Sequence, residues 1–306
     1  MDATMVAQVR RFNRVVTQRV GALDDHFLAR NRPLGEARVL WEIGPEGCDV
    51  RALRSRLELD SGYLSRLLRS LEAAGLVTVE PSEPDKRVHT ARLTSEGLAE
   101  RTVLDERSDE LAKSFLEPLN ERQRNRLVEA MSDVERLLTA AMVEIKPFDP
   151  LHPHAHYCIG QYFRELDQRF DAGFDPSISI SADPDELRPP AGLLLVATLR
   201  SEPIGCGALK FHPDKPTELK RMWVAHSARG LGIGRRLLAE LEAEAARNGS
   251  RRVRLETNES LAEAIALYRS SGYVEVEPFN DEPYAHHWFE KCLTEEVAVQ
   301  QLPDGG

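Results

Sequence analysis

The sequence predicts two domains: a mainly α-helical domain, then an α/β domain with a central mixed sheet. Helical periodicity with one short β interruption runs from Met1 to about Ala141. Beyond it, alternating apolar segments are separated by a glycine-rich turn and by helix-patterned segments, which is typical of a sheet covered by helices. The chain has 306 residues, enough for two domains of ordinary size. We expect the domains at 1–141 and 142–306.

The composition is that of a globular protein, with 42% hydrophobic residues and a mean hydropathy of −0.40. No apolar run approaches membrane-spanning length, and the N-terminus lacks a signal-peptide pattern. The cysteines show no Cys-x-x-Cys pair, which favours a reducing compartment. We expect a cytoplasmic protein with no membrane partner. The scattered cysteines are Cys48, Cys158, Cys206 and Cys292.

The formal net charge is −10, from 40 basic and 50 acidic residues. A negative total argues against unselective coating of nucleic acid, because phosphate binding needs a basic surface. A negative net charge is still compatible with a local basic surface that binds DNA.

Three helices are expected in the first half. Pro33–Gly44 has helical spacing and ends before Pro45. Asp49–Leu57 follows, and Asp60 or Ser61 can cap a third helix over Gly62–Ala73, which Gly75 ends.

The third helix has one apolar and one polar face. Its leucines share a stripe and are expected to be buried. Opposite them lie Arg66 and Arg69, flanked by Tyr63 and Ser65. A face with two arginines and hydrogen-bonding neighbours suits insertion into a DNA major groove, although a solvated helix face has the same composition. The leucines are Leu64, Leu67, Leu68 and Leu71.

A β-hairpin follows this helix directly. Gly75–Glu80 and Val88–Leu93 alternate as strands, and the tip between them carries Asp85, Lys86 and Arg87. Leu93-Thr94-Ser95-Glu96-Gly97 then begins a helix with Thr94 or Ser95 as its cap. Helix-turn-helix followed by this wing resembles the MarR family of bacterial regulators.

The resemblance implies that the domain binds double-stranded DNA. Arg87 would enter the minor groove, oriented by Asp85, while the third helix reads bases. The resemblance gives that reading role to Ser61, Tyr63, Ser65, Arg66 and Arg69.

Long amphipathic segments flank the winged domain. Val6–Arg30 carries one apolar stripe and Leu98–Ala141 carries another, more than a small domain needs for its own core. MarR-type domains dimerise through such helices, which implies a homodimer on a pseudo-palindromic operator. The second domain could equally cover these stripes. The stripe residues are Phe12, Val15, Val16, Val20, Leu23 and Phe27, then Leu127, Met131, Val134 and Leu138.

The most informative run of the second half is the glycine-rich segment Arg229–Gly234. It follows an alternating segment, Glu218–Val224, and opens a helix-patterned one, Arg235–Arg247. Glycines between a strand and a helix leave amide N–H groups unpaired beside the positive helix end, which suits a phosphate. The spacing Arg-x-x-Gly-x-Gly is neither the dinucleotide fingerprint nor a nucleotide P-loop. An ordinary glycine turn is the alternative.

The strands and helices expected around this segment argue against an ordinary glycine turn. Strands are expected from Val143 to Phe148 and on both sides of the Ser201–Pro203 turn. After the glycine segment, Arg252–Thr257 alternates as a strand, and Ala262–Ser270 reads as a helix. This order, with Ala264, Leu267, Tyr268, Gly272 and Tyr273 in the second motif, resembles the GNAT family of acetyltransferases.

The resemblance implies acetyl-CoA as cofactor. Amides of Trp223 and Val224 would bind its pantetheine arm, and Arg229 opens the motif that holds its pyrophosphate. Many family members have Asn where this chain has Leu261, and Asn258 is the candidate replacement. The pyrophosphate amides would come from Gly230, Leu231, Gly232, Ile233, Gly234 and Arg235.

Acetyl transfer needs a deprotonated amine and a proton for the departing thiolate. Tyr268 matches the tyrosine that serves as general acid in many GNAT enzymes; packing on the sheet is its alternative role. Glu218 starts the strand that leads to the glycine segment and is the candidate general base. A structural pairing of Glu218 with Lys220 or Lys210 is equally compatible with the sequence.

His152, His154 and His156 suggest a metal site, but proline interrupts them and no carboxylates complete the set. We expect no metal. The sequence thus predicts a bifunctional transcriptional regulator and N-acetyltransferase, acting on a primary amine of a small molecule or peptide. In the main alternative the second domain only senses acetyl-CoA or a small amine. In another, DNA binding is lost and the first domain only dimerises the enzyme.

Overall fold

The computed structural model describes residues 2–81, 88–180 and 182–293. The chain forms two compact units that divide between Ser132 and Asp133, inside helix α6 (Glu121–Ala141). Each unit has its own hydrophobic core. We retain Ala141, where α6 ends, as the proposed limit between the two domains.

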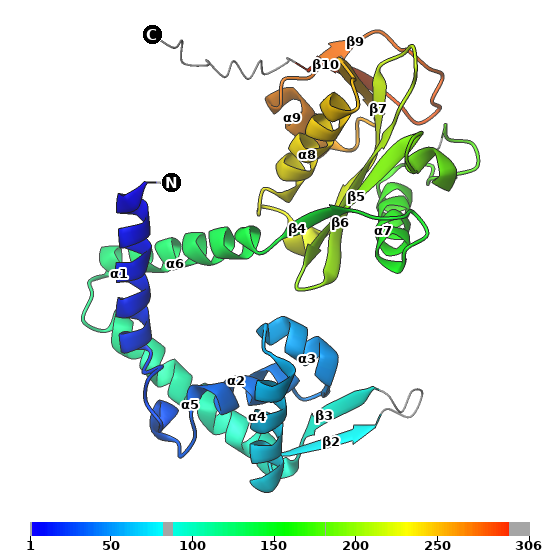
Figure 1. Ribbon diagram of the computed structural model, residues 1–306. Helices are drawn as coiled ribbons and strands as arrows, with labels where there is room; N and C mark the ends of the chain where they lie inside the picture. The colour runs from blue at the N-terminus through cyan, green and yellow to red at the C-terminus, as the bar shows by residue number, and fades with distance from the viewer. Residues whose placement is uncertain (1, 82–87, 181, 294–306) are drawn as a thin grey trace, which may run out of the picture. The chain divides into compact units, whose positions relative to one another are not determined.

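The first unit is a helical domain with a small antiparallel sheet (Figure 1). In the part of the chain that the structure describes, this sheet has three strands in the order β1-β3-β2. The short β1 was not expected and pairs with β3. The elements are α1 (Ala3–Arg19), α2 (Leu34–Ile43), β1 (Cys48–Asp49), α3 (Val50–Leu57), α4 (Ser61–Ala73), β2 (Val77–Pro81), β3 (His89–Leu93) and α5 (Ser95–Leu116).

The ends of these helices follow the capping residues in the sequence. Asp60 caps α4, because its Oδ1 accepts a hydrogen bond from the Tyr63 amide at 2.8 Å. Thr94 caps α5 by accepting from the amide of Gly97 at 3.0 Å. A Cβ at Gly97 would lie 2.0 Å from the Leu76 carbonyl oxygen, so only glycine lets α5 start this close to β2.

The helix expected over Val6–Arg30 is shorter than predicted. It ends at Arg19, and Gly21 follows with a φ of 68°. Phe27 leaves the predicted stripe and is buried in the core of the first unit, where its ring meets Trp41 edge-on at 6.2 Å. The sequence prediction was wrong here because the apolar spacing continues beyond the helix.

Arginines next to Phe27 fix this segment to α5. Arg30 and Arg32 each donate through Nε to the buried carboxylate of Glu100 at 3.0 Å. The hydrogen bond from Arg30 lowers the pKa of Glu100, and the charge of Arg32 adds to the effect. The segment after α1 is therefore held to the domain by an ion pair as well as by Phe27.

The second unit is built on a mixed sheet, as predicted. Across its described residues the sheet has seven strands in the order β4-β5-β6-β7-β8-β10-β9, with β7 and β8 parallel. The strands are β4 (Glu144–Pro147), β5 (Gly192–Leu199), β6 (Glu202–Lys210), β7 (Thr217–Val224), β8 (Arg252–Thr257), β9 (Val274–Val276) and β10 (His287–Cys292). The helices are α7 (Pro153–Arg169), α8 (Ile233–Arg247) and α9 (Ala262–Ser270).

Helices cover both faces of this sheet (Figure 1). Alternation along β5 sends Leu195 into the core shared with α8 and α9, and Leu194 into the core shared with α7. Among the described residues, no helix combines the length and apolar content needed to cross a lipid bilayer.

A β-bulge in β7 breaks the alternation expected for this strand. Arg221 has a φ of 55°, and the register between β6 and β7 shifts next to it. Leu219 and Met222 therefore both face the α8 side, whereas Trp223 faces the α7 side. Simple alternation along β7 would put Met222 on the same face as Glu218 and Lys220, but the extra residue at Arg221 moves Met222 to the opposite face.

Candidate functional site

The glycine segment forms an open cradle at the N-terminus of α8. Gly230 and Gly232 have φ angles of 81° and 76°, and a Cβ on either would meet no atom within 4 Å. Among the described residues, the amides from Gly230 to Arg235 have no hydrogen-bond acceptor. Unpaired donors beside the positive end of a 15-residue helix fit an anion such as the diphosphate of acetyl-CoA.

A cavity of about 510 Å³ extends from this cradle between α7, β7 and α9. We call it the cofactor chamber. It reaches Tyr162 on α7 and Tyr268 on α9. Of the residues predicted to bind the cofactor, it is lined by Trp223, Val224, Arg229, Gly230, Gly232, Ile233, Gly234 and Arg235.

A smaller chamber of about 100 Å³, the acceptor chamber, adjoins it. Both chambers are lined by Tyr162, Met222 and Tyr268, so they meet at the tyrosine that we predicted to be the general acid. The acceptor chamber also contains Lys220 from β7 and Glu256 from β8. The acceptor chamber is thus lined by titratable groups from four elements, α7, α9, β7 and β8.

Tyr268 is positioned by packing in the core. Its side chain is buried, with ring centroids 5.8 Å from Tyr273 and 6.2 Å from Phe289. Burial raises the pKa of its hydroxyl well above the ordinary value, and the charge of Glu256 raises it further. The hydroxyl therefore keeps its proton at neutral pH.

Glu256 is the carboxylate that the sequence analysis missed. Its Oε1 is paired with the ammonium of Lys220. Its Oε2 is buried and has no hydrogen-bond partner. A buried carboxylate oxygen without a donor is costly, so this atom is suited to receive one from a ligand in the acceptor chamber.

Glu218, the predicted general base, lies outside both chambers. Its Oε1 accepts from Arg254 at 2.6 Å, and its Oε2 lies 3.4 Å from Lys220. Burial acts to raise the pKa of Glu218, but the charges of Lys220 and Arg254 outweigh it and lower the pKa. The structure does not bring Glu218 and Tyr268 together; it places Glu218 in the structural pairing that the sequence left open.

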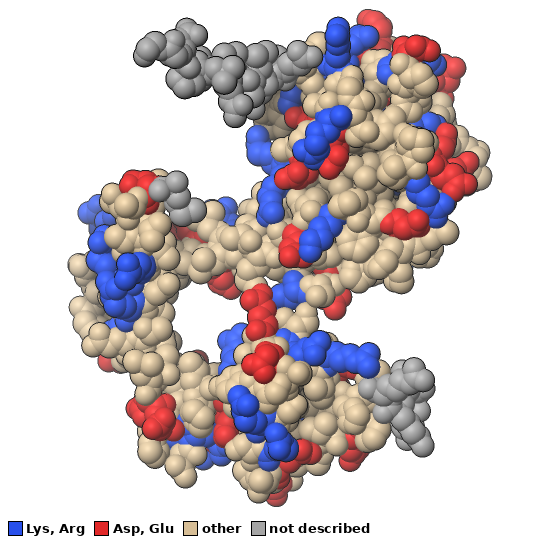
Figure 2. Space-filling model, viewed as in Figure 1, with Lys and Arg blue, Asp and Glu red and all other residues tan. Residues whose placement is uncertain are grey.

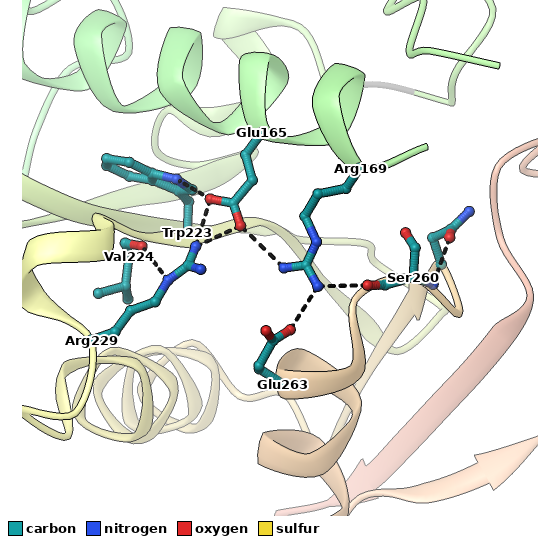
Figure 3. A network of polar contacts seen from close by, with 8 residues as sticks. Glu165, Arg169, Trp223, Val224, Arg229, Ser260 and Glu263 are labelled. Carbon is teal, nitrogen blue, oxygen red and sulfur yellow. Dashed lines mark hydrogen bonds and ion pairs between the residues drawn. The ribbon is translucent and has the colours of Figure 1, made fainter. Parts of the chain in front are cut away.

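A polar network ties α7 to the cradle (Figure 3). The carboxylate of Glu165 accepts from Arg229 at 2.6 Å, from the Trp223 indole at 3.0 Å and from Arg169 at 3.3 Å. Arg229 also donates to the Val224 carbonyl at 3.3 Å. Glu165 was missed by the sequence analysis, although its spacing from Arg169 is that of a helical ion pair. The side chains of Arg229 and Trp223 therefore form part of the wall of the cofactor chamber, held in place by Glu165.

The side chains of the other residues predicted to bind the cofactor contact different parts of the second unit. Arg235 donates to the Ser270 hydroxyl at 3.1 Å, which links the cradle to the end of α9. Asn258 lines the acceptor chamber, and its amide nitrogen donates to the Tyr284 carbonyl at 2.8 Å. Leu231 packs against the core of the sheet.

The histidines at the start of α7 cap the helix and pack against an aromatic ring. His152 caps α7 through Nδ1, which accepts from the His154 amide at 3.2 Å. Both rings lie against Phe148, at 4.7 and 5.8 Å. Within residues 2–81, 88–180 and 182–293, no group of three His, Cys, Asp or Glu side chains is arranged to hold a metal ion.

In the first unit, α4 exposes the residues predicted to contact DNA. The Arg66 guanidinium lies 5.5 Å from the ring of Tyr63, and Arg69 donates to the Ser65 carbonyl at 3.2 Å. Ser61 forms the first turn of α4 and is also exposed. Asp85 and Arg87 lie outside the described residues. Figure 2 shows basic and acidic side chains interspersed on the visible face, so no single-sign field covers it.

Within the described part of the chain, α1 and α6 have no buried residue. Phe12 on α1 and Met131 on α6 remain 43% and 49% exposed, respectively, and Leu138 is 60% exposed. Apolar side chains in such rows usually mark a contact with another protein surface.

Comparisons with known proteins agree with these features. Residues 134–273 match the model of the acetyltransferase (GNAT) family, and residues 31–88 match the MarR family. An IAA acetyltransferase from Azospirillum brasilense is 37% identical over 125 residues, which are 40% of this chain and 80% of that protein. The HTH-type transcriptional regulator TtmR from Methylorubrum extorquens is 43% identical over 67 residues, 22% of this chain and 33% of its own length.

A crystal structure of a GNAT-family acetyltransferase from Staphylococcus aureus aligns with 50% of this chain and 99% of its own, with a TM-score of 0.43 and 16% identity. The family models and the sequence relatives carry the assignment. The chain belongs to the GNAT family of acetyltransferases, whose members use acetyl-CoA, and it carries a MarR-family domain ahead of the acetyltransferase domain.

Proposed function

We propose that this chain is a bifunctional protein, a DNA-binding transcriptional regulator and an acetyl-CoA-dependent N-acetyltransferase that acts on a primary amine. The observation that carries the enzymatic part is the junction of the two chambers at Tyr268, where Glu256, whose buried Oε2 has no hydrogen-bond partner, is among the residues that line the acceptor chamber. One chamber suits the cofactor and the other suits the amine.

The reaction chemistry can be assigned to two side chains. Bound acetyl-CoA supplies an acetyl thioester at the junction. The Oε2 atom of Glu256 accepts a hydrogen bond from the amine and takes its proton, while the other oxygen stays paired with the Lys220 ammonium. The Tyr268 hydroxyl, whose pKa is raised by burial, holds the proton that a departing thiolate requires. Glu256 replaces Glu218 as our candidate base.

The regulatory part rests on the exposed face of α4 and on the uncovered apolar rows of α1 and α6. We propose that α4 reads the major groove through Ser61, Tyr63, Ser65, Arg66 and Arg69. In the wing, Arg87 would contact the minor groove and Asp85 would orient it. A homodimer that buries α1 and α6 would present two copies of α4 to a pseudo-palindromic operator.

Two assays test this proposal. Mixing the protein with acetyl-CoA and primary amines should release CoA; tight CoA binding without turnover across a broad amine panel would contradict the enzymatic part. In gel-shift titrations on the DNA upstream of its own gene, Arg69→Ala should weaken binding about tenfold. Arg107→Ala, which removes an exposed arginine of α5, is the matched control and should bind as the wild type does.

A second candidate function is that the acetyltransferase domain senses acetyl-CoA and regulates DNA binding. The observation that favours it is Arg236, in the first turn of α8 directly after the cradle. Its guanidinium donates to the carbonyls of Ala140 and Val143 at 3.0 and 2.8 Å, at the end of α6. Because α6 begins in the first unit, cofactor binding at the cradle has a direct contact through which to act on it.

If sensing operates, acetyl-CoA should change the operator affinity of the wild type, and Arg236→Gln should remove most of that change. The affinity for acetyl-CoA should vary less than about threefold, since Arg236 does not line the cofactor chamber. Arg247→Gln, at the opposite end of α8, is the control. Identical gel shifts with and without acetyl-CoA would exclude sensing.

A further inference from the structure

Aromatic rings form a wall of the acceptor chamber. Phe163, Phe170, Phe174 and Tyr284 all line it. Phe174 is at the centre of this group, with ring centroids 4.9 Å from Tyr284, 5.6 Å from Phe163 and 5.9 Å from Phe170. Such a wall binds flat apolar groups through burial and ring contacts.

Two other polar side chains of the chamber, Glu282 and Tyr284, are already engaged within the protein. Glu282 accepts from the Ile180 amide at 2.6 Å and from the Ser179 hydroxyl at 3.0 Å. The Tyr284 hydroxyl accepts from the Asp175 amide at 2.9 Å. Among the described lining residues, Glu256 is therefore the one carboxylate with an oxygen left for an amine.

The volume of the acceptor chamber limits the size of the ligand. That volume is about 100 Å³. An apolar cavity of about 150 Å³ takes one benzene molecule, so the ligand carries at most one ring, and part of it extends into the adjoining cofactor chamber. Lys220 and Arg221 also line the chamber and would repel a second positive charge.

We propose that the acceptor is a small primary monoamine whose amino group is joined by a short link to one aromatic ring. The amino group would meet Glu256 beside Tyr268, and the ring would lie against Phe174 and its neighbours. This deepens the proposed function, because it names the class of amine acetylated at the same site.

The test compares 2-phenylethylamine with 1,4-diaminobutane, which has a second ammonium and no ring. Binding of each amine to the full chain saturated with CoA is measured by calorimetry, and turnover is measured by CoA release from acetyl-CoA. We expect 2-phenylethylamine to bind at least tenfold more tightly and to be the better substrate. Equal or better binding and turnover of 1,4-diaminobutane would overturn the proposal.

Variants locate the site. Phe174→Leu and Phe170→Leu should each weaken binding of 2-phenylethylamine about tenfold, because they remove a ring contact but keep an apolar side chain. Phe148→Leu removes a ring that packs on His152 outside the chamber and should have no effect. Equal affinity in all three variants would contradict the assignment. Binding that depends on Phe174, together with no turnover of any amine, would support this ligand class and contradict the proposed catalysis instead.

Discussion

Replacing Glu256 by glutamine should lower kcat about 100-fold while leaving the affinity for acetyl-CoA within about threefold. Glutamine has nearly the same shape, but it cannot take a proton from the amine. Steady-state kinetics with a saturating primary amine, with calorimetry for acetyl-CoA, would measure both quantities. A rise in pH should partly restore the rate of the variant, because a larger fraction of the amine is then already deprotonated.

Glu218→Gln is the matched comparison. Both carboxylates are on neighbouring strands, and each is paired with a cation: Arg254 for Glu218 and Lys220 for Glu256, with Lys220 also 3.4 Å from Glu218. The comparison therefore separates proton transfer from the loss of an ion pair. We expect Glu218→Gln to change melting temperature more than kcat. A large kcat loss in this variant, with little loss for Glu256→Gln, would reinstate the assignment made from sequence.

Replacing Gly232 by aspartate should weaken CoA binding about 100-fold, the loss expected when a charge-assisted hydrogen bond is replaced by repulsion. Gly232 is in the left-handed region, which aspartate tolerates better than most residues. The introduced carboxylate would lie at the N-terminus of α8, where it competes for the unpaired amides and repels a diphosphate.

The control is Gly249→Asp, because Gly249 follows α8, has a φ of 81° and also has open space around its missing Cβ. Backbone strain is then similar in both variants, and only Gly232 lines the cofactor chamber. Titration calorimetry with CoA and thermal melting would be compared. Equal CoA affinity in the two variants would show that the cradle does not contribute to CoA binding.

Local patterns in the sequence predicted much of the fold. The caps of α4 and α5 and the leucine stripe of α4 depend on residues within four positions of one another. The mixed sheet and the cradle at the start of α8 likewise follow from alternation and from glycines at a strand–helix turn. Such signals act between neighbours in the chain, so they can be read before the chain is folded.

The errors lie where one residue changes a pattern. The bulge at Arg221 exchanges the faces that simple alternation along β7 would give Met222 and Trp223. Gly21 ends α1 early, and Phe27 then packs on Trp41 instead of extending the stripe. Periodicity alone does not locate either break.

The sequence by itself determined that this chain joins a winged-helix domain to an acetyltransferase domain with a glycine-rich turn between a strand and a helix. Only the tertiary structure decided which carboxylate shares a chamber with Tyr268. Lys220 and Glu256 are 36 positions apart, and Arg229 and Glu165 are 64 apart. These pairs meet because β7 and β8 adjoin in the sheet and α7 covers the cradle. Contacts of that range depend on how whole elements pack, which no local pattern specifies.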